Sequence, residues 1–270
     1  MVITGASDGI GAIAARVLSK MGAKVVVVGR SPEKTKQVAQ EIDADYYVAD
    51  FADLSQVRKL AAKLQKKYPR IDVLLNNAGG IFGNRQLTVD GHEKCFQVNH
   101  LAPFLLTNLL LDRLIASQAK IINTSSIANE RYGDIDINDL DLEHGFSPNR
   151  AYGNAKLANI LFTKELHRRY GDKGISAVAV HPGKIATNFA NDTTSYLRLF
   201  YRTPLAKLFL DSPEEGAEPL IWLASTEAGT DWQPGAYYEK HKLGKENQQA
   251  ADSGLAKQLW ELSASYTRPE

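Results

Sequence analysis

Two patterns of apolar and polar positions alternate along the chain: short runs rich in Val and Ile, and longer stretches with helical spacing. Runs that are apolar throughout are typical of parallel strands buried on both faces of a sheet. The predicted strands are residues 2–4, 24–29, 45–50, 73–76, 120–124 and 175–181. The predicted helices are residues 10–21, 33–42, 54–67, 93–115 and 152–170. Repeated alternation of strand and helix predicts an α/β fold with a doubly wound parallel sheet.

Two segments interrupt this alternation and differ from each other in composition. Residues 129–150 are polar and carry Gly133, Gly145 and Pro148, which predicts a long loop. Residues 192–215 mix aromatic and leucine side chains with Arg and Lys, so we interpret them as a substrate lid containing a short amphipathic helix. Packing of this helix on the core and weak contact with a membrane surface are the alternatives. The chain has no linker or internal repeat, so we expect one domain over residues 1–270.

Composition narrows the classes of protein to which the chain can belong. Hydrophobic residues make up 44% and charged residues 23% of the 270 residues, as in folded globular proteins. The formal net charge is +1, which gives nucleic-acid binding no electrostatic support. Cys95 is the only cysteine, and neither a signal peptide nor the ~20 apolar residues of a membrane span is visible. We therefore expect a cytoplasmic protein that binds no nucleic acid.

A glycine-rich turn joins the first predicted strand to the first predicted helix. Glycines let the backbone turn tightly and approach a pyrophosphate without a Cβ atom, and the following helix directs free N–H groups at the anion. A plain glycine-rich turn is the alternative, but the position between strand and helix favours a dinucleotide site. The turn consists of Thr4, Gly5, Ala6, Ser7, Asp8, Gly9, Ile10 and Gly11.

The end of the second predicted strand indicates which dinucleotide is bound. Enzymes that prefer NAD usually place an acidic residue here for the ribose 2′-hydroxyl, but this chain has Arg30 followed by Ser31. A guanidinium suits the 2′-phosphate of NADP, because it can make a bidentate charge-assisted contact. A solvated arginine is the alternative. Asp50, at the end of the third strand, is a candidate for contact with the adenine amino group.

Tyr152 and Lys156 open a predicted helix four residues apart, so their side chains share one face. An unperturbed tyrosine has a pKa of about 10, and a neighbouring cation lowers that pKa by favouring the phenolate. A tyrosine tuned in this way can donate a proton to a carbonyl oxygen or accept one from an alcohol. Before this helix, a strand ends at Ser125 and Ser126, on the side of an open sheet where ligands bind.

Other chemistries find less support in the residues. The six histidines have no metal-ligand spacing, so we predict no metal site. No Gly-x-Ser-x-Gly motif surrounds Ser126, which disfavours a hydrolase. Cys95 falls within an apolar helical pattern and is interpreted as a small core residue.

Taken together, these motifs resemble the short-chain dehydrogenase/reductase superfamily over about residues 1 to 190. Residues 99–101, 158–162 and 259–260 are further similar to the branch of retinol dehydrogenases and the WW-domain oxidoreductase. The resemblance implies a single Rossmann-type sheet of about seven strands, in the order 3-2-1-4-5-6-7, flanked by helices. The matching motifs are residues 4–11, Asn76-Asn77-Ala78-Gly79, Asn99, Ser126, Tyr152 with Lys156, and Pro182-Gly183 with Thr187.

The resemblance also implies a role for each matching residue. Tyr152 would be the acid/base, Lys156 would lower its pKa and hold the nicotinamide ribose, and Ser126, rather than Ser125, would orient the substrate oxygen. Asn99 would hold a water molecule in a proton relay to Lys156. Asn76, Ala78 and Gly79 would line the adenosine side, and Ile185 and Thr187 would fix the carboxamide. The predicted cofactor site comprises Gly5, Ser7, Asp8, Gly9, Ile10, Gly11, Arg30, Ser31, Asp50, Phe51, Asn76, Ala78, Gly79, Tyr152, Lys156, Pro182, Gly183, Ile185 and Thr187.

The resulting hypothesis is an NADP(H)-dependent oxidoreductase that interconverts a carbonyl and an alcohol on a lipophilic small molecule, such as a retinoid, steroid or aldehyde. A non-catalytic NADP-binding sensor or scaffold on the same fold is the alternative. The resemblance further implies a homodimer formed through the helices at 93–115 and 152–170.

Overall fold

The structure is a computed structural model that describes residues 1–183 and 212–268. Most of the predicted lid, residues 192–211, lies outside the described residues, and so do Ile185 and Thr187.

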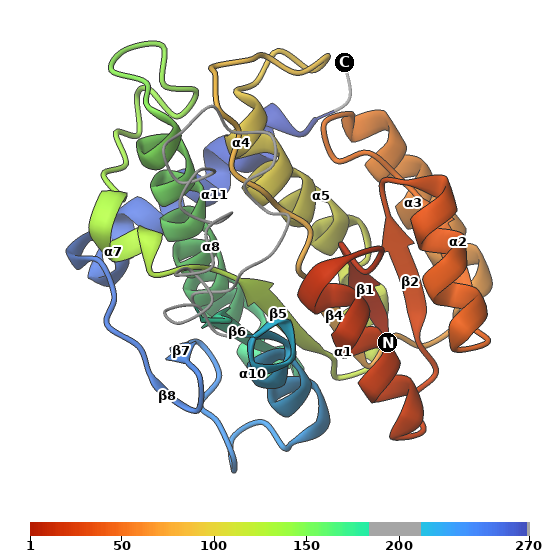
Figure 1. The fold of residues 1–270 in the computed structure, drawn as a ribbon. Coiled ribbons are helices and arrows are strands. Elements are labelled where there is room, and N and C mark those ends of the chain that lie inside the picture. Colours follow the sequence, from red (N-terminus) through yellow and green to blue (C-terminus); the bar gives the residue numbers. More distant parts are fainter. Residues whose placement is uncertain (184–211, 269–270) are drawn as a thin grey trace.

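The described strands form one sheet in the order β3-β2-β1-β4-β5-β6-β7-β8 (Figure 1). Strands β1 to β7 are parallel, and β8 pairs antiparallel with β7. The predicted order of seven strands is confirmed, and the short β8 adds an eighth strand at the edge. The strands are β1 (Val2–Thr4), β2 (Val26–Gly29), β3 (Asp45–Val48), β4 (Val73–Asn76), β5 (Lys120–Thr124), β6 (Ser176–His181), β7 (Tyr237–Glu239) and β8 (Lys242–Leu243).

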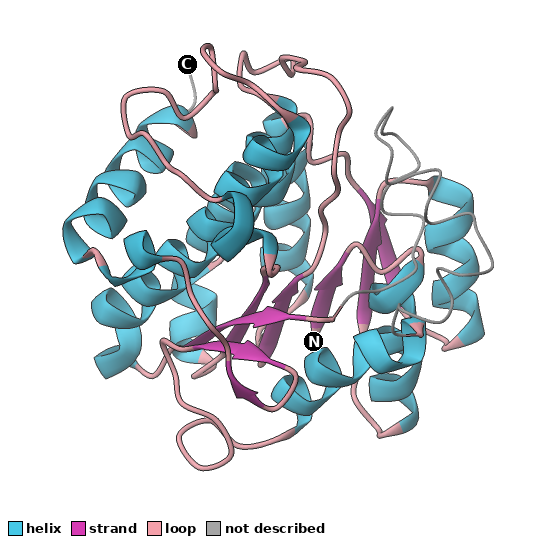
Figure 2. Ribbon diagram, turned by 60° about the vertical axis from the view of Figure 1, so that its left-hand side comes forward, coloured by secondary structure: helices cyan, strands magenta, loops and turns pink. Residues whose placement is uncertain are grey.

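Helices cover both faces of this sheet (Figure 2). In the described ranges, none of them is long and apolar enough to cross a membrane. The α-helices are α1 (Gly9–Lys20), α2 (Pro32–Glu41), α3 (Leu54–Lys67), α4 (Lys94–Phe96), α5 (Ala102–Leu109), α6 (Leu111–Ala116), α7 (Ala128–Tyr132), α8 (Pro148–Tyr170), α10 (Pro213–Ser225) and α11 (Ser253–Tyr266). A π-helical turn, η1 (Gln97–Leu101), and two 3-10 turns, η2 (Gly171–Lys173) and η5 (Gln248–Ala251), complete the described elements.

Alternate residues of the central strands enter two separate hydrophobic cores. Val2 packs with residues of α3, α5 and α8, whereas Ile3 packs with residues of α1, α2 and α10. Because side chains alternate across a strand, both faces must be apolar, which explains the continuous Val and Ile runs. The edge strand β3 is different, since Tyr46 and Val48 are exposed.

Two of the predicted helical segments differ from the structure by more than one residue at an end. The helix expected at 93–115 is divided into α4, η1, α5 and α6, and in η1 the Ala102 N–H bonds to Gln97 O, five residues back. The loop expected at 129–150 contains most of α7, and α8 already begins at Pro148. Ser147 caps α8 by accepting from Arg150 N, and proline is favoured in the first helical turn, where its missing N–H costs nothing.

Helix α11 packs over both helices that the sequence predicted as the dimer interface. The Trp260 ring lies 5.0 Å from that of Phe104 on α5 and 5.6 Å from that of Phe162 on α8. Figure 1 shows α11, in blue, crossing behind α8. The faces of α5 and α8 that Trp260 covers are therefore occupied within one chain, so the predicted dimer would have to use other faces of these helices or displace α11.

We expect Trp260→Ala to lower the free energy of unfolding by about 3–5 kcal/mol, because it empties a buried site between three aromatic rings. The third ring is that of Tyr170, whose centroid lies 6.1 Å away. Urea unfolding followed by circular dichroism would measure the loss, with Trp260→Phe as the control that keeps an aromatic ring in place. A loss as large for Trp260→Phe as for Trp260→Ala would contradict this account.

Candidate active site

The glycine turn brings the backbone of β1 close to the segment that follows β4. Gly5 has a φ of +65°, and a Cβ on it would lie 2.8 Å from Ala78 Cα. A Cβ on Gly11 would lie 2.4 Å from Gly5 O. Both positions therefore exclude any other residue, as expected of a cradle into which a pyrophosphate fits at the start of α1.

The Thr4 hydroxyl joins the carboxyl ends of β1 and β4. It donates to Leu75 O at 3.2 Å and accepts from the N–H groups of Asn77 and Ala78 at 3.0 and 3.1 Å. The Asn77 amide also donates to Thr4 O and Gly5 O. These two residues were not among the predicted site residues, although both stand in the quoted motifs. Their bonds fix the crevice at the point where the strand order reverses.

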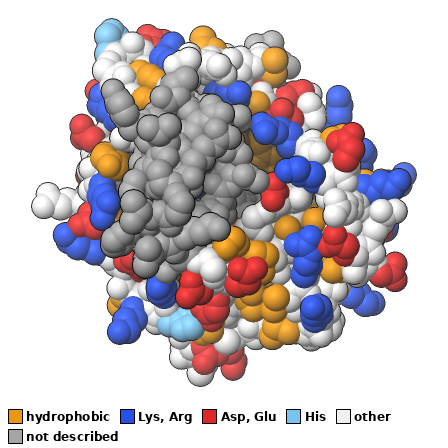
Figure 3. Space-filling model, in the orientation of Figure 1, with side chains coloured by type: hydrophobic (Ala, Val, Ile, Leu, Met, Phe, Trp, Pro, Cys, Tyr) orange, Lys and Arg blue, Asp and Glu red, His pale blue; other side chains and the backbone are white. Residues whose placement is uncertain are grey.

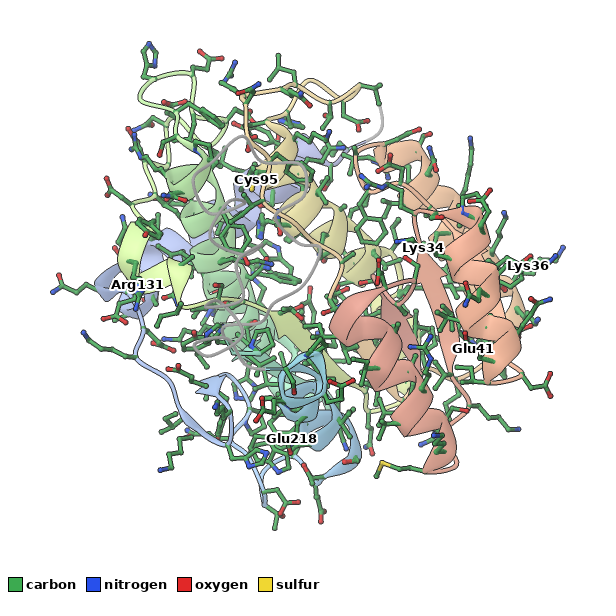
Figure 4. The ribbon with its side chains drawn as sticks, in the orientation of Figure 1. Lys34, Lys36, Glu41, Cys95, Arg131 and Glu218 are labelled. Atoms are coloured by element: carbon green, nitrogen blue, oxygen red, sulfur yellow. The ribbon has the colours of Figure 1, made fainter. Side chains whose placement is uncertain are left out.

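Arg30 directly follows β2, and its side chain is exposed beside the start of α2. Ser31 caps α2 and accepts from Lys34 N. The Lys34 side chain extends from α2 (Figure 4). Its ammonium lies 2.6 Å from the Asp8 carboxylate, so α2 is tied to the glycine turn. Asp8 itself caps α1 by accepting from Gly9 N. Lys34 is a second cation at this edge that the sequence prediction missed, although it stands one helical turn after Arg30.

Acidic and basic side chains are intermixed on the face that carries α1 and α2 (Figure 3). Arg30 makes no ion pair in the described part of the chain. Its guanidinium would therefore be available to a 2′-phosphate bound at this edge.

Three other predicted cofactor residues are held by contacts of their own. Asp50 accepts from Ala52 N at 2.9 Å, and the Phe51 side chain is buried in the core beneath it. The Asn76 amide donates to Asn123 Oδ1 at 2.9 Å and to Thr107 Oγ1 at 3.1 Å, which places its side chain between β4, β5 and α5.

Tyr152 and Lys156 lie on one face of α8, as predicted. The Lys156 Nζ is 5.4 Å from the centre of the Tyr152 ring and donates to Thr124 O, at the end of β5, at 3.0 Å. Burial lowers the pKa of the Lys156 ammonium to about 8. An ammonium desolvated in this way is a strong electrostatic neighbour for a phenolate, because little water screens the pair.

The structure gives the two serines after β5 different surroundings. The Ser125 hydroxyl is buried and donates to the main-chain oxygen of Lys156 at 2.7 Å. Ser126 is partly exposed, and its hydroxyl accepts from Ala128 N at 3.2 Å, which leaves its proton available to another acceptor. This difference supports Ser126, rather than Ser125, as the residue that contacts substrate.

Asn99 lies in η1, where its side chain holds the turn after β4. Its amide donates to Gly80 O at 2.9 Å and accepts from Gly80 N at 3.1 Å. A Cβ on Gly79 would lie 2.4 Å from Asn99 Oδ1 and 3.2 Å from Lys156 Nζ, so the backbone, the amide and the ammonium meet at Gly79. Cys95, labelled in Figure 4, is buried beside them. Its thiol donates to Gly80 O, and burial raises the pKa of this thiol.

The remaining predicted residues lie at the end of β6. Pro182 and Gly183 follow His181 directly, and Gly183 has a φ of +107° that favours glycine. Over residues 1–183 and 212–268, no three His, Cys, Asp or Glu side chains gather in a way that could hold a metal ion.

Comparison with known proteins agrees with this arrangement. Residues 1–197 match the family model described as short chain dehydrogenase. The chain belongs to the short-chain dehydrogenase/reductase superfamily. It is 38% identical over 276 residues to retinol dehydrogenase 13 of Homo sapiens, covering 98% of this chain and 83% of that protein. This places it in the retinol dehydrogenase-like branch, so it is an oxidoreductase that acts on alcohol and carbonyl groups and uses NAD(P)(H).

A bacterial relative is similar over an even larger share of its length. The "Putative daunorubicin C-13 ketoreductase DnrU" of Streptomyces sp. (strain C5) is 42% identical over 274 residues, covering 98% of this chain and 91% of that protein. An uncharacterized protein from Mycobacterium Paratuberculosis has a crystal structure with a TM-score of 0.80, 33% identity and coverage of 100% and 93%. A protein of Escherichia coli CFT073 solved with NADPH has a TM-score of 0.67 and 25% identity, with coverage of 88% and 95%.

Proposed function

We propose that this short-chain dehydrogenase is an NADP(H)-dependent enzyme that interconverts a carbonyl and an alcohol on a lipophilic substrate. The observation that carries the proposal is the Tyr152–Lys156 pair, with a desolvated ammonium beside a phenol at the carboxyl edge of the sheet. A non-catalytic sensor would have no need of this arrangement.

The chain's own residues then perform the proton chemistry. In reduction, the Tyr152 phenol donates its proton to the substrate oxygen, and the Ser126 hydroxyl orients that oxygen. The Lys156 ammonium stabilises the phenolate that remains and returns a proton through a path that includes Asn99. In oxidation, the Tyr152 phenolate accepts the proton of the alcohol, so the same groups serve both directions.

The residues present fit a bound dinucleotide. Gly5 and Gly11 leave a cradle that a Cβ would fill, and α1 starts directly behind it. Arg30 is proposed to bind the 2′-phosphate, and Lys156 the nicotinamide ribose. When bound, the nicotinamide supplies or accepts the hydride.

The class of substrate rests on the relatives. Their names specify daunorubicin and retinol, which both contain a large hydrophobic portion, a fused ring system in one and a polyene in the other. A homodimer, a cytoplasmic location and a weak membrane contact through residues 192–215 remain predictions.

We expect the purified protein to oxidise NADPH in the presence of all-trans-retinaldehyde, decanal, a steroid ketone or daunorubicin, and to prefer NADPH to NADH. Glyceraldehyde, which is small and hydrophilic, is the control and should be reduced with a lower kcat/KM. The absorbance of NADPH follows the reaction directly. Failure with every apolar carbonyl compound, or equal kcat/KM for glyceraldehyde, would overturn the proposed substrate class.

A further inference from the structure

A chain of buried hydrogen bonds runs from α11 to the catalytic lysine. The Ser263 hydroxyl lies 2.9 Å from His100 Nε2, and His100 Nδ1 lies 3.3 Å from Asn159 Oδ1. The Asn159 amide nitrogen donates to Asn99 O at 3.0 Å and to Thr124 O at 3.1 Å. None of Ser263, His100 and Asn159 is exposed by more than 4%.

The main-chain oxygen of Asn99 needs this partner because of a proline. Within a helix, a carbonyl bonds to the N–H four residues later, and the residue four positions after Asn99 is Pro103, which has no N–H. The π-helical turn η1 at this place reflects the same interruption. The Asn159 amide supplies the missing donor from α8.

The other oxygen that this amide bonds, Thr124 O, also accepts a hydrogen bond from Lys156. Thr124 O receives hydrogen bonds from both Lys156 Nζ and Asn159 Nδ2, so the two donors share one carbonyl. Asn159 therefore limits how strongly that carbonyl can attract the ammonium. It also fixes the distance between β5, which carries Thr124, and η1, which carries Asn99.

The two carbonyls determine where the protons lie along this chain of hydrogen bonds. Because both accept, the amide must present its nitrogen to them and its oxygen to His100. His100 must then carry its proton on Nδ1, and its Nε2 accepts from the Ser263 hydroxyl. Burial lowers the pKa of His100 to about 4, so the ring is neutral at physiological pH.

We propose that Asn159 is a positioning residue, which holds the Lys156 ammonium beside Tyr152 through the shared Thr124 carbonyl and is itself oriented by His100 and Ser263. The inference rests on the proposed roles of Tyr152 and Lys156. Without the Asn159 amide, the Thr124 carbonyl keeps the Lys156 ammonium as its donor and the Asn99 carbonyl loses its partner, so both oxygens draw the ammonium away from the phenol. The Tyr152 phenolate is then less stabilised, and its pKa rises.

The Cys95 thiol is a titratable neighbour of Lys156 in the described part of the chain. It belongs to α4, and its raised pKa keeps it neutral at physiological pH. A change in the Tyr152 titration after substitution of Asn159 would therefore not come from the charge of this thiol.

The test compares Asn159→Leu with Thr163→Val. Thr163 lies one turn further along α8 and is also buried. Its hydroxyl donates to Asn159 O and accepts from Asn123 Nδ2, but it bonds to neither the Asn99 nor the Thr124 carbonyl. Near-ultraviolet absorbance gives the phenolate titration of Tyr152 as the difference between each protein and its Tyr152→Phe counterpart, without any substrate. We expect the pKa of Tyr152 to rise by about 0.5 to 1 unit in Asn159→Leu and to stay unchanged in Thr163→Val.

Turnover provides a second readout. With the best carbonyl substrate of the panel above, kcat should fall about 3- to 10-fold in Asn159→Leu, and its pH limb should move to higher pH. If Asn159→Leu does not fold, His100→Phe decides the question, because it keeps a ring against Phe96 but cannot orient the amide. A raised Tyr152 pKa in that variant supports the proposal, and an unchanged pKa overturns it.

Lys156→Ala separates this inference from the proposed function. If Lys156→Ala raises the pKa of Tyr152 while Asn159→Leu does not, Asn159 has no positioning role, although the catalytic pair stands. If Lys156→Ala leaves both the titration and turnover unchanged, the proposed function itself is wrong.

Discussion

Replacement of Tyr152 by phenylalanine is expected to reduce turnover by about 10²- to 10⁴-fold, the range typical for loss of a general acid or base. The variant keeps the ring, which packs in a buried cluster with Phe82 and Ala155, and loses only the proton that is transferred. The fold and the affinity for NADPH should therefore remain close to those of the unmodified protein. Single-turnover oxidation of NADPH measures the loss of turnover, and thermal unfolding checks the fold.

Tyr170→Phe is the matched control, because Tyr170 is the last residue of the same helix and lies away from the site. Its turnover should equal that of the unmodified protein. Turnover of Tyr152→Phe within threefold of the unmodified protein would exclude Tyr152 as the acid/base.

Removal of the Arg30 side chain should weaken NADPH binding by about 10- to 150-fold, because hydrogen bonds to charged groups contribute about 1.5–3 kcal/mol. NADH has no 2′-phosphate, so its affinity should change little. Arg30→Ala thus converts a preference for NADPH into similar affinity for the two cofactors. Quenching of tryptophan fluorescence during titration with each cofactor gives both dissociation constants.

Lys36→Ala serves as the control for Arg30→Ala, since Lys36 is an exposed cation on the adjoining helix α2 (Figure 4). It should leave both affinities unchanged. A loss of the same size for NADH and NADPH in Arg30→Ala would mean that Arg30 does not read the 2′-phosphate.

The sequence located the first six strands because their signals are local, whereas the strand order came from the family resemblance and β7 was not located. Apolar runs marked β1, β2, β4, β5 and β6, and the glycine turn marked the start of α1. The start of α8 was missed because Pro148 was interpreted as a loop residue, whereas here it follows the cap residue Ser147 and begins the helix. The division of the helix at 93–115 was missed as well, although Pro103 was the signal that could have revealed it.

The hydrogen bonds that support the site could not be predicted from local signals. Asn159 and Asn99 are 60 residues apart, and His100 and Ser263 are 163 apart, so their contacts depend on how α8 and α11 pack and not on any local spacing. The pairing of Tyr152 with Lys156 is the opposite case, because four residues on a helix bring two side chains together by geometry alone.

The position of α11 has a consequence for how the protein folds during synthesis. Synthesis proceeds from the N-terminus, so the glycine turn, β4 and the Tyr152 helix all leave the ribosome before α11 does. Until Trp260 emerges, the aromatic faces of α5 and α8 have no cover, and His100 lacks the hydroxyl of Ser263. The nascent chain therefore carries a complete set of predicted catalytic side chains before their supporting helix is made, and the apolar surface that α11 covers is open to association until α11 arrives.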